Sequence, residues 1–390
     1  MSALVRMVNV LMEIRMKSFN SVFLPIFVVS LASSCTPSKP TRLGQALYIG
    51  KDLLTDYRPQ PSLVTESHRI NRPKFPAIDV HTHFKTSLDP KFLLKKMDEL
   101  GVKRVVNLSG GWGKKLDTTL KTFHGFDPAR FLIFCNVDFS RIDEPDFDSQ
   151  MAKFLEEAHA KGAAGLKVFK NLGLTVKDIS GKTVPVDDER LDPIWQKAGE
   201  LGMPVLIHVA DPVAFFKPID RVNERWLQLH RHPNWSFYGP QFPEREEILV
   251  QRNRVLSRHP NTTFIGAHVG NNAEDLKAAG AVLDKYPNFN VDIAGRVAEL
   301  GRQPYSARRF FMKYQNRILF GTDRYPGRPD QPRYKIYYRF LETQDEYFDY
   351  YKHTFPPTGE WKIYGLHLPD EVLKKVYFQN AERLLGIVGK

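Results

Sequence analysis

The sequence is poor in cysteine, with only Cys35 and Cys135 in 390 residues. Two cysteines are too few for a disulfide framework. Cys135 follows the apolar run at residues 131–134, so we expect it to be buried as a small hydrophobic side chain. Long apolar runs are also lacking. The run near the N-terminus, residues 22–31, is about half the length of a membrane-spanning helix, which needs about 20 residues.

Several sequence signatures of binding proteins are missing as well. No Gly-x-Gly-x-x-Gly pattern follows a predicted strand, which argues against a dinucleotide-binding domain. The formal net charge is +12, but the sequence has no nucleic-acid-binding motif and no dense block of lysine and arginine. We therefore interpret the charge mainly as a solvated basic surface, and we do not expect nucleic acid as a partner.

The N-terminus carries an export pattern. Lys17 precedes the apolar run, and Ala32-Ser33-Ser34-Cys35 follows it. Small residues ending in cysteine resemble a bacterial lipobox, in which the cysteine becomes the acylated first residue of the mature protein. We expect residues 1–35 to be a lipoprotein-type signal segment and residues 36–74 a tether and N-terminal extension. The protein would be exported to the bacterial cell envelope and held at a membrane by a lipid on Cys35.

From residue 75 to residue 390, strand patterns alternate with amphipathic helix patterns. The predicted strands are residues 78–84, 102–108, 130–139, 164–169, 204–209, 262–269, 289–293 and 317–323. The predicted helices are residues 89–100, 151–160, 187–201, 244–259, 273–286, 305–315 and 368–385. This alternation predicts an α/β fold with a parallel sheet. Eight units in this length favour a closed (β/α)8 TIM barrel, with a doubly wound open sheet as the alternative.

The first predicted strand contains two histidines. Regular alternation along a strand would place Asp79, His81 and His83 on one face. Two imidazoles near the end of a strand are unusual in a core and typical of half a metal site. Asp79 lies one pleat deeper, so we expect it to orient the site rather than bind the metal.

Other polar residues end the later strands. Lys167 lies in the fourth strand, and His208, His268 and Asp323 end the fifth, sixth and eighth. In a closed barrel these positions meet at the mouth where barrel enzymes carry out catalysis. Each residue alone could be structural: a hydrogen-bonded core histidine, a helix cap or a salt-bridge partner. Together with the first-strand pair, they favour a divalent metal site, with Zn²⁺ expected and Mn²⁺ as the alternative.

The roles within this set follow from its chemistry. The two first-strand histidines, His208 and Asp323 are predicted metal ligands, because neutral imidazoles and a carboxylate suit such an ion. Asp323 is also the predicted catalyst that takes a proton from water beside the metal. His268 could be either a further ligand or an acid–base catalyst.

These motifs resemble the amidohydrolase superfamily, and more closely its amidohydrolase-related branch, which includes aminocarboxymuconate-semialdehyde decarboxylase, lactonases and hydratases. The resemblance covers residues 76–386. Its carriers are Asp79-Val80-His81-Thr82-His83, Pro204-Val205-Leu206-Ile207-His208, Gly266-Ala267-His268, Phe320-Gly321-Thr322-Asp323, Leu368-Pro369-Asp370 and Asn380-Ala381-Glu382-Arg383-Leu384-Leu385.

The resemblance implies that His81, His83, His208 and Asp323 bind a metal, commonly zinc. It implies that His268 faces the substrate as a catalyst or binds a second ion. Lys167 matches the position of the carboxylated lysine that bridges two ions in binuclear members. One and two ions are therefore both open, with one slightly favoured.

Two long connections follow the fifth and eighth strands, at residues 210–243 and 325–365, and both are rich in aromatic residues. We expect both to belong to the mouth, and the first to form a lid or a pocket wall there; the alternative for the first is an interface for a partner subunit. Lys170, Arg296 and Arg324 are candidate binders of a substrate carboxylate or phosphate, although each could instead be a solvated or structural charge.

The first functional hypothesis is a metal-dependent hydrolase acting on a C–N, lactone or ester-like bond of a small, anionic substrate. The alternative is a metal-dependent non-oxidative decarboxylase, which would use the same ligands. A non-catalytic binding protein that keeps the barrel is a third hypothesis, and the intact ligand set argues against it.

Overall fold

A computed structural model describes residues 60–328, 333–352 and 357–387. The chain separates into two compact units, Met1–Leu63 and Val64–Lys390. The predicted signal segment and Cys35 lie outside the described residues, as does most of the predicted tether. Within the described part of the chain, no helix is both long and apolar enough to cross a membrane.

Eight parallel strands form the centre of the second unit, and each is hydrogen-bonded to the next in chain order. They are β1 (Ala77–Thr82), β2 (Val102–Asn107), β3 (Phe131–Asn136), β4 (Gly165–Val168), β5 (Val205–Ile207), β6 (Phe264–Gly266), β7 (Phe289–Asp292) and β8 (Ile318–Leu319). Two backbone hydrogen bonds join the segment just after β8 to β1: Val80 N–H donates to the Phe320 carbonyl at 3.0 Å, and Asp323 N–H donates to the His81 carbonyl at 2.8 Å. The predicted (β/α)8 barrel is confirmed.

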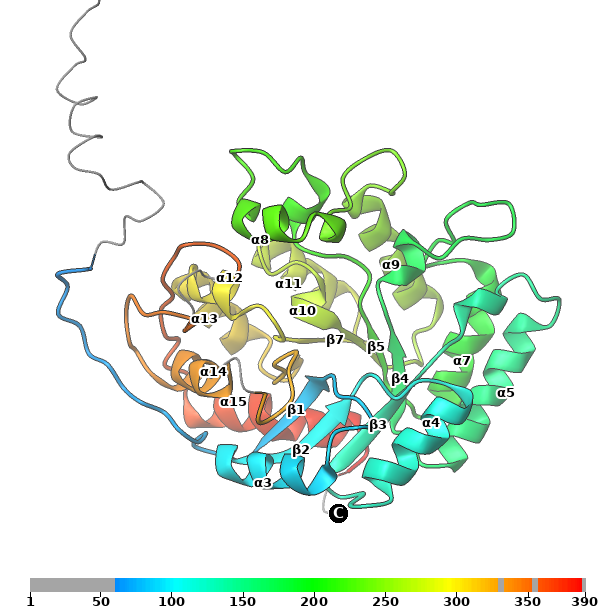
Figure 1. The fold of residues 1–390 in the computed structure, drawn as a ribbon, viewed down its shortest axis with the longest axis horizontal. Coiled ribbons are helices and arrows are strands. Elements are labelled where there is room, and N and C mark those ends of the chain that lie inside the picture. The colour runs from blue at the N-terminus through cyan, green and yellow to red at the C-terminus, as the bar shows by residue number, and fades with distance from the viewer. Residues whose placement is uncertain (1–59, 329–332, 353–356, 388–390) are drawn as a thin grey trace, which may run out of the picture. The chain divides into compact units, whose positions relative to one another are not determined.

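Helices alternate with the strands, and Figure 1 shows α3, α4, α5 and α7 outside the barrel strands. The helices are α3 (Pro90–Leu100), α4 (Gly113–Thr119), α5 (Phe147–Ala160), α6 (Asn171–Leu174), α7 (Asp192–Glu200), α8 (Trp226–Arg231), α9 (Arg245–Arg258), α10 (Ala267–Gly270), α11 (Leu276–Lys285), α12 (Val297–Gly301), α13 (Pro304–Lys313), α14 (Arg333–Glu342), α15 (Asp370–Lys374) and α16 (Asn380–Leu384). The ends of α3 follow the local signals: Asp89 caps its first turn, and Gly101 ends it at φ 71°.

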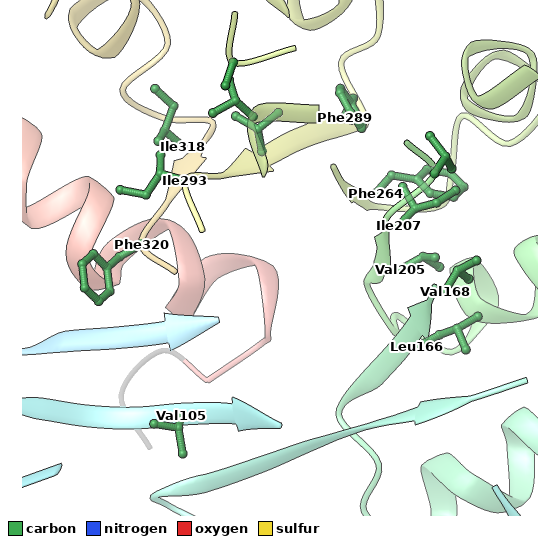
Figure 2. Packing of buried hydrophobic residues seen from close by; sticks show 14 of the residues in the cluster. Val105, Leu166, Val168, Val205, Ile207, Phe264, Phe289, Ile293, Ile318 and Phe320 are labelled. Atoms are coloured by element: carbon green, nitrogen blue, oxygen red, sulfur yellow. The ribbon is translucent and has the colours of Figure 1, made fainter. Parts of the chain in front are cut away.

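The core has two layers. An outer cluster fills the space between strands and helices. Figure 2 labels some of its members: Val105, Leu166, Val168, Val205, Ile207, Phe264, Phe289, Ile293, Ile318 and Phe320. An inner cluster fills the barrel with Ile78, Val80, Val106, Leu108, Leu132, Phe134, Leu206, Ile265, Ala267 and Leu319. Because Lys167 lies between outer-facing Leu166 and Val168, its side chain points into the barrel. Cys135 is buried, as predicted.

The connection after β8 is partly helical. It contains α14, whose Tyr334, Tyr337 and Tyr338 are buried and pack around Phe320 with ring centroids 6.4, 5.9 and 5.9 Å away. These three rings therefore belong to the core, whereas other residues of the same connection line the cavity at the mouth. The i, i+3, i+4 spacing of the three tyrosines marks the apolar face of a helix that packs against the barrel.

Candidate metal centre

The strand that carries the two histidines is irregular. The pairing of β1 with β2 shifts between Asp79 and Thr82. Asp79 accepts a 2.7 Å hydrogen bond from the hydroxyl of Tyr334 on α14, whereas His81 Nδ1 lies 2.8 Å from Asp292 at the end of β7. Regular alternation along β1 would place Asp79 and His81 on one face. The register shift breaks this alternation, so Asp79 faces α14 whereas His81 faces the end of β7.

Asp79 forms hydrogen bonds with both segments that supply the predicted ligands, β1 and the segment after β8. Its carboxylate accepts hydrogen bonds from the backbone N–H of His81 at 3.0 Å and of Thr322 at 3.2 Å. It also accepts one from the Thr322 hydroxyl at 2.6 Å. Burial raises the pKa of Asp79 to about 7, although these donors act in the opposite direction. Asp79 thus links the backbone of β1 to that of Thr322, and its role in orienting the site stays a prediction.

Three predicted ligands lie together at the barrel mouth. Asp323 Oδ1 is 3.7 Å from His81 Nε2 and 3.6 Å from His83 Nε2, and one ligand atom from each residue falls within 4.8 Å of the others. Tetrahedral ligands at zinc–nitrogen distances would be about 3.4 Å apart. The spacing of these atoms thus fits a divalent ion.

Each of the four site imidazoles has one ring nitrogen engaged by the protein. The pairs are His81 Nδ1 with Asp292 at 2.8 Å, His83 Nδ1 with Ser109 at 2.8 Å, His208 Nε2 with the Ala210 carbonyl at 3.0 Å, and His268 Nδ1 with the Ala294 carbonyl at 2.6 Å. Metal-binding histidines usually hold their second nitrogen in this way, which fixes the tautomer and the ring orientation. The nitrogens left for a ligand are Nδ1 of His208 and Nε2 of the other three.

Electrostatics favour the neutral imidazoles that a metal requires. Burial lowers the pKa of His83 to about 3 and that of His208 to about 4. Burial, followed by the nearby charge of Arg296, lowers the pKa of His268 well below its usual value. For Asp323, burial would raise the pKa, but His81 and His83 lower it to about 2. At neutral pH these three histidines therefore offer uncharged nitrogens, and Asp323 offers an ionised carboxylate.

Lys167 adds an independent sign of a bound group. Its side chain is 1% exposed, and its amine has no hydrogen-bond partner among the described residues. Burial lowers the pKa of this amine to about 7. A buried polar atom without a partner is costly and is usually explained by a ligand, ion or function. The residues present thus fit a metal site of one or two ions.

Two site residues adopt left-handed backbone conformations. His268 has φ 59°, and Asp323 has φ 60°. Residues other than glycine rarely occupy this region, and such strain concentrates at functional sites. Hydrogen bonds hold both conformations: the N–H of His268 donates to Asp292 at 2.9 Å, and that of Asp323 donates to the His81 carbonyl at 2.8 Å.

The structure places His208 beside this group rather than within it. Its ring is 4.5 Å from the ring of His268, which in turn lies 4.8 Å from that of His81. Close to His208, the predicted substrate binder Lys170 forms an ion pair with Asp211. Its charge is therefore already engaged by a carboxylate.

A cavity of about 760 Å³ opens next to the site. His208, His268 and Asp323 line it, and so do residues of both long connections. Its walls also carry six cations, which are Lys170, Arg225, Arg231, Arg296, Arg324 and Arg333. Two carboxylates, those of Asp211 and Asp323, also line it, and Arg225 forms an ion pair with the buried Glu299. Cations therefore still outnumber carboxylates in this cavity.

Sequence reasoning missed four residues of this region, which are Ser109, Asp211, Asp292 and Arg333. The signal for Asp292 was available, because it ends the seventh strand just as the predicted ligands end theirs. Asp211 lies three residues after His208, which also could have drawn attention to it. For Ser109 and Arg333 no local pattern distinguishes the residue from its neighbours.

The sequence profile of the Amidohydrolase family matches residues 89–387. The chain belongs to the amidohydrolase family. The family predicted from the sequence motifs is thus confirmed, and the protein is an enzyme of this family. No curated protein matches the sequence.

This amidohydrolase is also similar to solved structures at low identity. A 2,6-dihydroxybenzoate decarboxylase from Rhizobium is 16% identical, with a TM-score of 0.48, covering 83% of this chain and 100% of its own. A manganese-bound dihydroxybenzoic acid decarboxylase from Polaromonas is 14% identical, with a TM-score of 0.48 and coverage of 82% and 98%. A 4-oxalomesaconate hydratase from Rhodopseudomonas palustris is 14% identical, with a TM-score of 0.47 and coverage of 80% and 96%.

Proposed function

We propose that this protein is a metal-dependent hydrolase that uses water to cleave a C–N, lactone or ester-like bond of a small anionic substrate. The observation that carries this proposal is the spacing of His81, His83 and Asp323, whose ligand atoms lie within 4.8 Å of one another beside the cavity. Family membership supports an enzyme, and the donor set supports the metal.

Two imidazoles and one carboxylate suit Zn²⁺, and Mn²⁺ is the alternative. We propose one catalytic ion, held by His81, His83 and Asp323, with His208 as a further ligand through Nδ1. When bound, such an ion lowers the pKa of a bound water to about 7 and polarises a carbonyl. A second ion would bring Lys167 into the site, because its buried amine points into the same barrel interior.

The residues of the chain would handle protons and orientation. Asp323 has a side chain that is 33% exposed, and its lowered pKa keeps it ionised, so its second oxygen can accept a proton from water. His268 lines the cavity and holds its ring through the Ala294 carbonyl. Its remaining nitrogen, Nε2, can then pass a proton to or from the substrate.

The positive cavity supports an anionic substrate. Arg296 and Arg324 line it directly, and Arg333 adds a third guanidinium. Guanidinium groups bind carboxylate and phosphate with two parallel hydrogen bonds. Lys170 is less suited to direct binding, because its ammonium already faces Asp211. We therefore assign substrate binding mainly to Arg296 and Arg324, with Lys170 in a supporting role.

A non-oxidative decarboxylase is the second candidate. The observation that favours it is the position of Arg296, which lines the same cavity as His268 and whose charge, after burial, lowers the pKa of that histidine. An arginine that holds a substrate carboxylate beside a neutral imidazole would suit loss of carbon dioxide followed by protonation. The same ligands serve both reactions, so only the products separate them.

The test uses the purified full-length protein. Metal content would be measured by mass spectrometry, and activity would be measured with Zn²⁺ and Mn²⁺ on lactones, amides and carboxylic acids, with carbon dioxide recorded in parallel. We expect hydrolysis without carbon dioxide release. The variant His83→Asn should lose metal and activity, whereas His159→Asn, on the exposed face of α5, should keep both. A protein that retains no metal and shows no activity would refute the proposal.

We also propose that a lipid on Cys35 holds the exported protein at a bacterial membrane, on the basis of the N-terminal sequence pattern. The substrate would then reach the enzyme in the cell envelope. Cys35→Ser should release the protein from the membrane fraction. Unchanged membrane association of this variant would contradict the anchor.

A further inference from the structure

Asp292 ends β7 beneath the metal site, and none of its surface is exposed. Its carboxylate accepts three hydrogen bonds. Oδ2 faces His81 Nδ1 at 2.8 Å, and Oδ1 accepts the backbone N–H of His268 and of Ala294, both at 2.9 Å. One buried carboxylate therefore contacts a predicted metal ligand and the predicted acid–base residue.

The contact with His81 determines which of its nitrogens can bind a metal. An ionised carboxylate only accepts hydrogen bonds, so the Nδ1 that faces it must carry the proton. The lone pair of the neutral ring is then on Nε2, the atom that lies 3.7 Å from Asp323 Oδ1. The other oxygen of Asp292 already accepts two backbone N–H groups, so the carboxylate acts as an acceptor throughout this site.

The contact with His268 acts on the backbone. His268 and Val269 have φ 59° and 60°, a conformation that side-chain-bearing residues rarely adopt. Asp292 Oδ1 binds the N–H of His268 and also that of Ala294, whose own carbonyl accepts from His268 Nδ1 at 2.6 Å. The backbone and the ring of His268 are thus both tied to the segment that follows β7.

We propose that Asp292 is a positioning residue that presents Nε2 of His81 to the metal and holds His268 at its place in the cavity. This inference rests on the proposed metal site. Asp292 does not itself reach the cavity, because it is fully buried behind His81 and is not among the residues that line the opening.

The variant Asp292→Asn is the sharpest test. Its amide oxygen can still accept the two backbone N–H groups, but its NH₂ then faces His81 Nδ1 and favours the tautomer with the proton on Nε2. We expect a folded protein whose zinc affinity, measured by competition with a chelator, falls 10- to 100-fold. The control Asp275→Asn changes the exposed cap of α11, which accepts from Ala278 N–H at 2.9 Å, and should keep the wild-type affinity. Wild-type affinity in Asp292→Asn would overturn the proposal.

A measurement on the unaltered chain covers the case in which the variant does not fold. Nitrogen NMR of histidine-labelled, metal-free protein at about pH 8 reports which ring nitrogen of His81 carries the proton, with the signal assigned by its loss in His81→Asn. We expect a protonated Nδ1. An unprotonated Nδ1 would overturn the role of Asp292. If the wild-type protein binds no metal, the proposed function fails. The position of the proton on His81 is measured without metal, so it still tests whether Asp292 selects the tautomer of His81.

Discussion

The backbone N–H of Asp323 donates a 2.8 Å hydrogen bond to the carbonyl oxygen of His81. This bond joins the segment after the last strand to the first strand, and the side chains of the same two residues meet at the metal site. A metal ion bound there would therefore stabilise the contact between β1 and the segment after β8, where the barrel closes. Closure of the fold and assembly of the site depend on the same pair of segments.

The first prediction concerns metal removal. Because a metal that binds the folded chain and not the unfolded one stabilises it by mass action, chelation should lower the free energy of unfolding. The loss should be about 2.7 kcal/mol when the reference sample holds metal at 100 times its Kd. Thermal unfolding with and without chelator would measure it. The variant His83→Asn should unfold at the same temperature with and without chelator. If chelator lowers its unfolding temperature as much as that of the wild type, the stabilising metal does not bind at His83.

The second prediction concerns Lys167 in metal-free protein. Its pKa is near 7 in the folded chain, against an ordinary value of 10.5. Between these values the unfolded chain binds more protons, so stability should rise with pH from about 7 to 10, by at most about 1.4 kcal/mol per unit. Lys167→Met should lose this slope and be the more stable protein at pH 7. Denaturant unfolding across this range would show it.

Metal analysis of the same variant bears on the number of ions. With one catalytic ion, Lys167→Met should retain the wild-type metal content. A wild-type content of two ions that falls to one in the variant would instead establish a bridging lysine.

The third prediction concerns the hydroxyl of Tyr334, which donates a 2.7 Å hydrogen bond to the fully buried Asp79. Tyr334→Phe removes one of the donors to that carboxylate, so it should destabilise the fold by about 1–3 kcal/mol. Chemical denaturation would give the value. Tyr305→Phe is the matched control, since that side chain is 81% exposed, and it should change stability little. Equal effects of the two variants would argue against the role of the bond.

The fourth prediction concerns His68, in the segment before β1. Its backbone N–H donates to Asp345 at 2.7 Å, and its ring forms a hydrogen bond with the same carboxylate. That hydrogen bond raises the pKa of His68 above its usual 6.5. The protonated pair should thus stabilise the fold fully below pH 6.5 and lose this contribution as pH rises through the raised pKa.

The check is the difference in melting temperature between the wild type and His68→Ala, measured from about pH 5 to pH 9. The difference should shrink towards high pH. His159→Ala, an exposed residue on α5, should show no comparable trend. A difference that grows with pH would reverse the assigned sign.

The fifth prediction concerns substrate charge. Arg296 lines the cavity beside His268, so Arg296→Gln should reduce kcat/KM for anionic substrates by roughly 10- to 100-fold, in line with the loss of a charged hydrogen bond. Neutral substrates of the same shape should be affected much less. Arg309→Gln, on the exposed side of α13, serves as the control. A uniform loss on both substrate classes would indicate a structural role for Arg296.

Much of this fold follows from local sequence patterns. Strand periodicity located all eight strands, and Asp89 and Gly101 marked both ends of α3, because capping depends on nearby residues alone. His81 and His83 also stood out locally, since two imidazoles at a strand end suit a metal better than a core. The closed barrel then brought Asp323 to them, as the order of strands predicts.

Other features depend on contacts that no local pattern contains. A register shift in β1 turned Asp79 towards Tyr334, and the apolar face of α14 placed three tyrosines of the connection after β8 in the core. Asp211 engaged Lys170, which the sequence suggested as a substrate binder. Asp292 contacts His81 across 211 positions of sequence.

The sequence by itself therefore determined the barrel, the family and the predicted ligand types, because periodicity, caps and short motifs act over a few residues. Only the tertiary structure decided which nitrogen each histidine presents and which charges are already paired. These properties depend on hydrogen bonds between segments that meet only when the barrel closes.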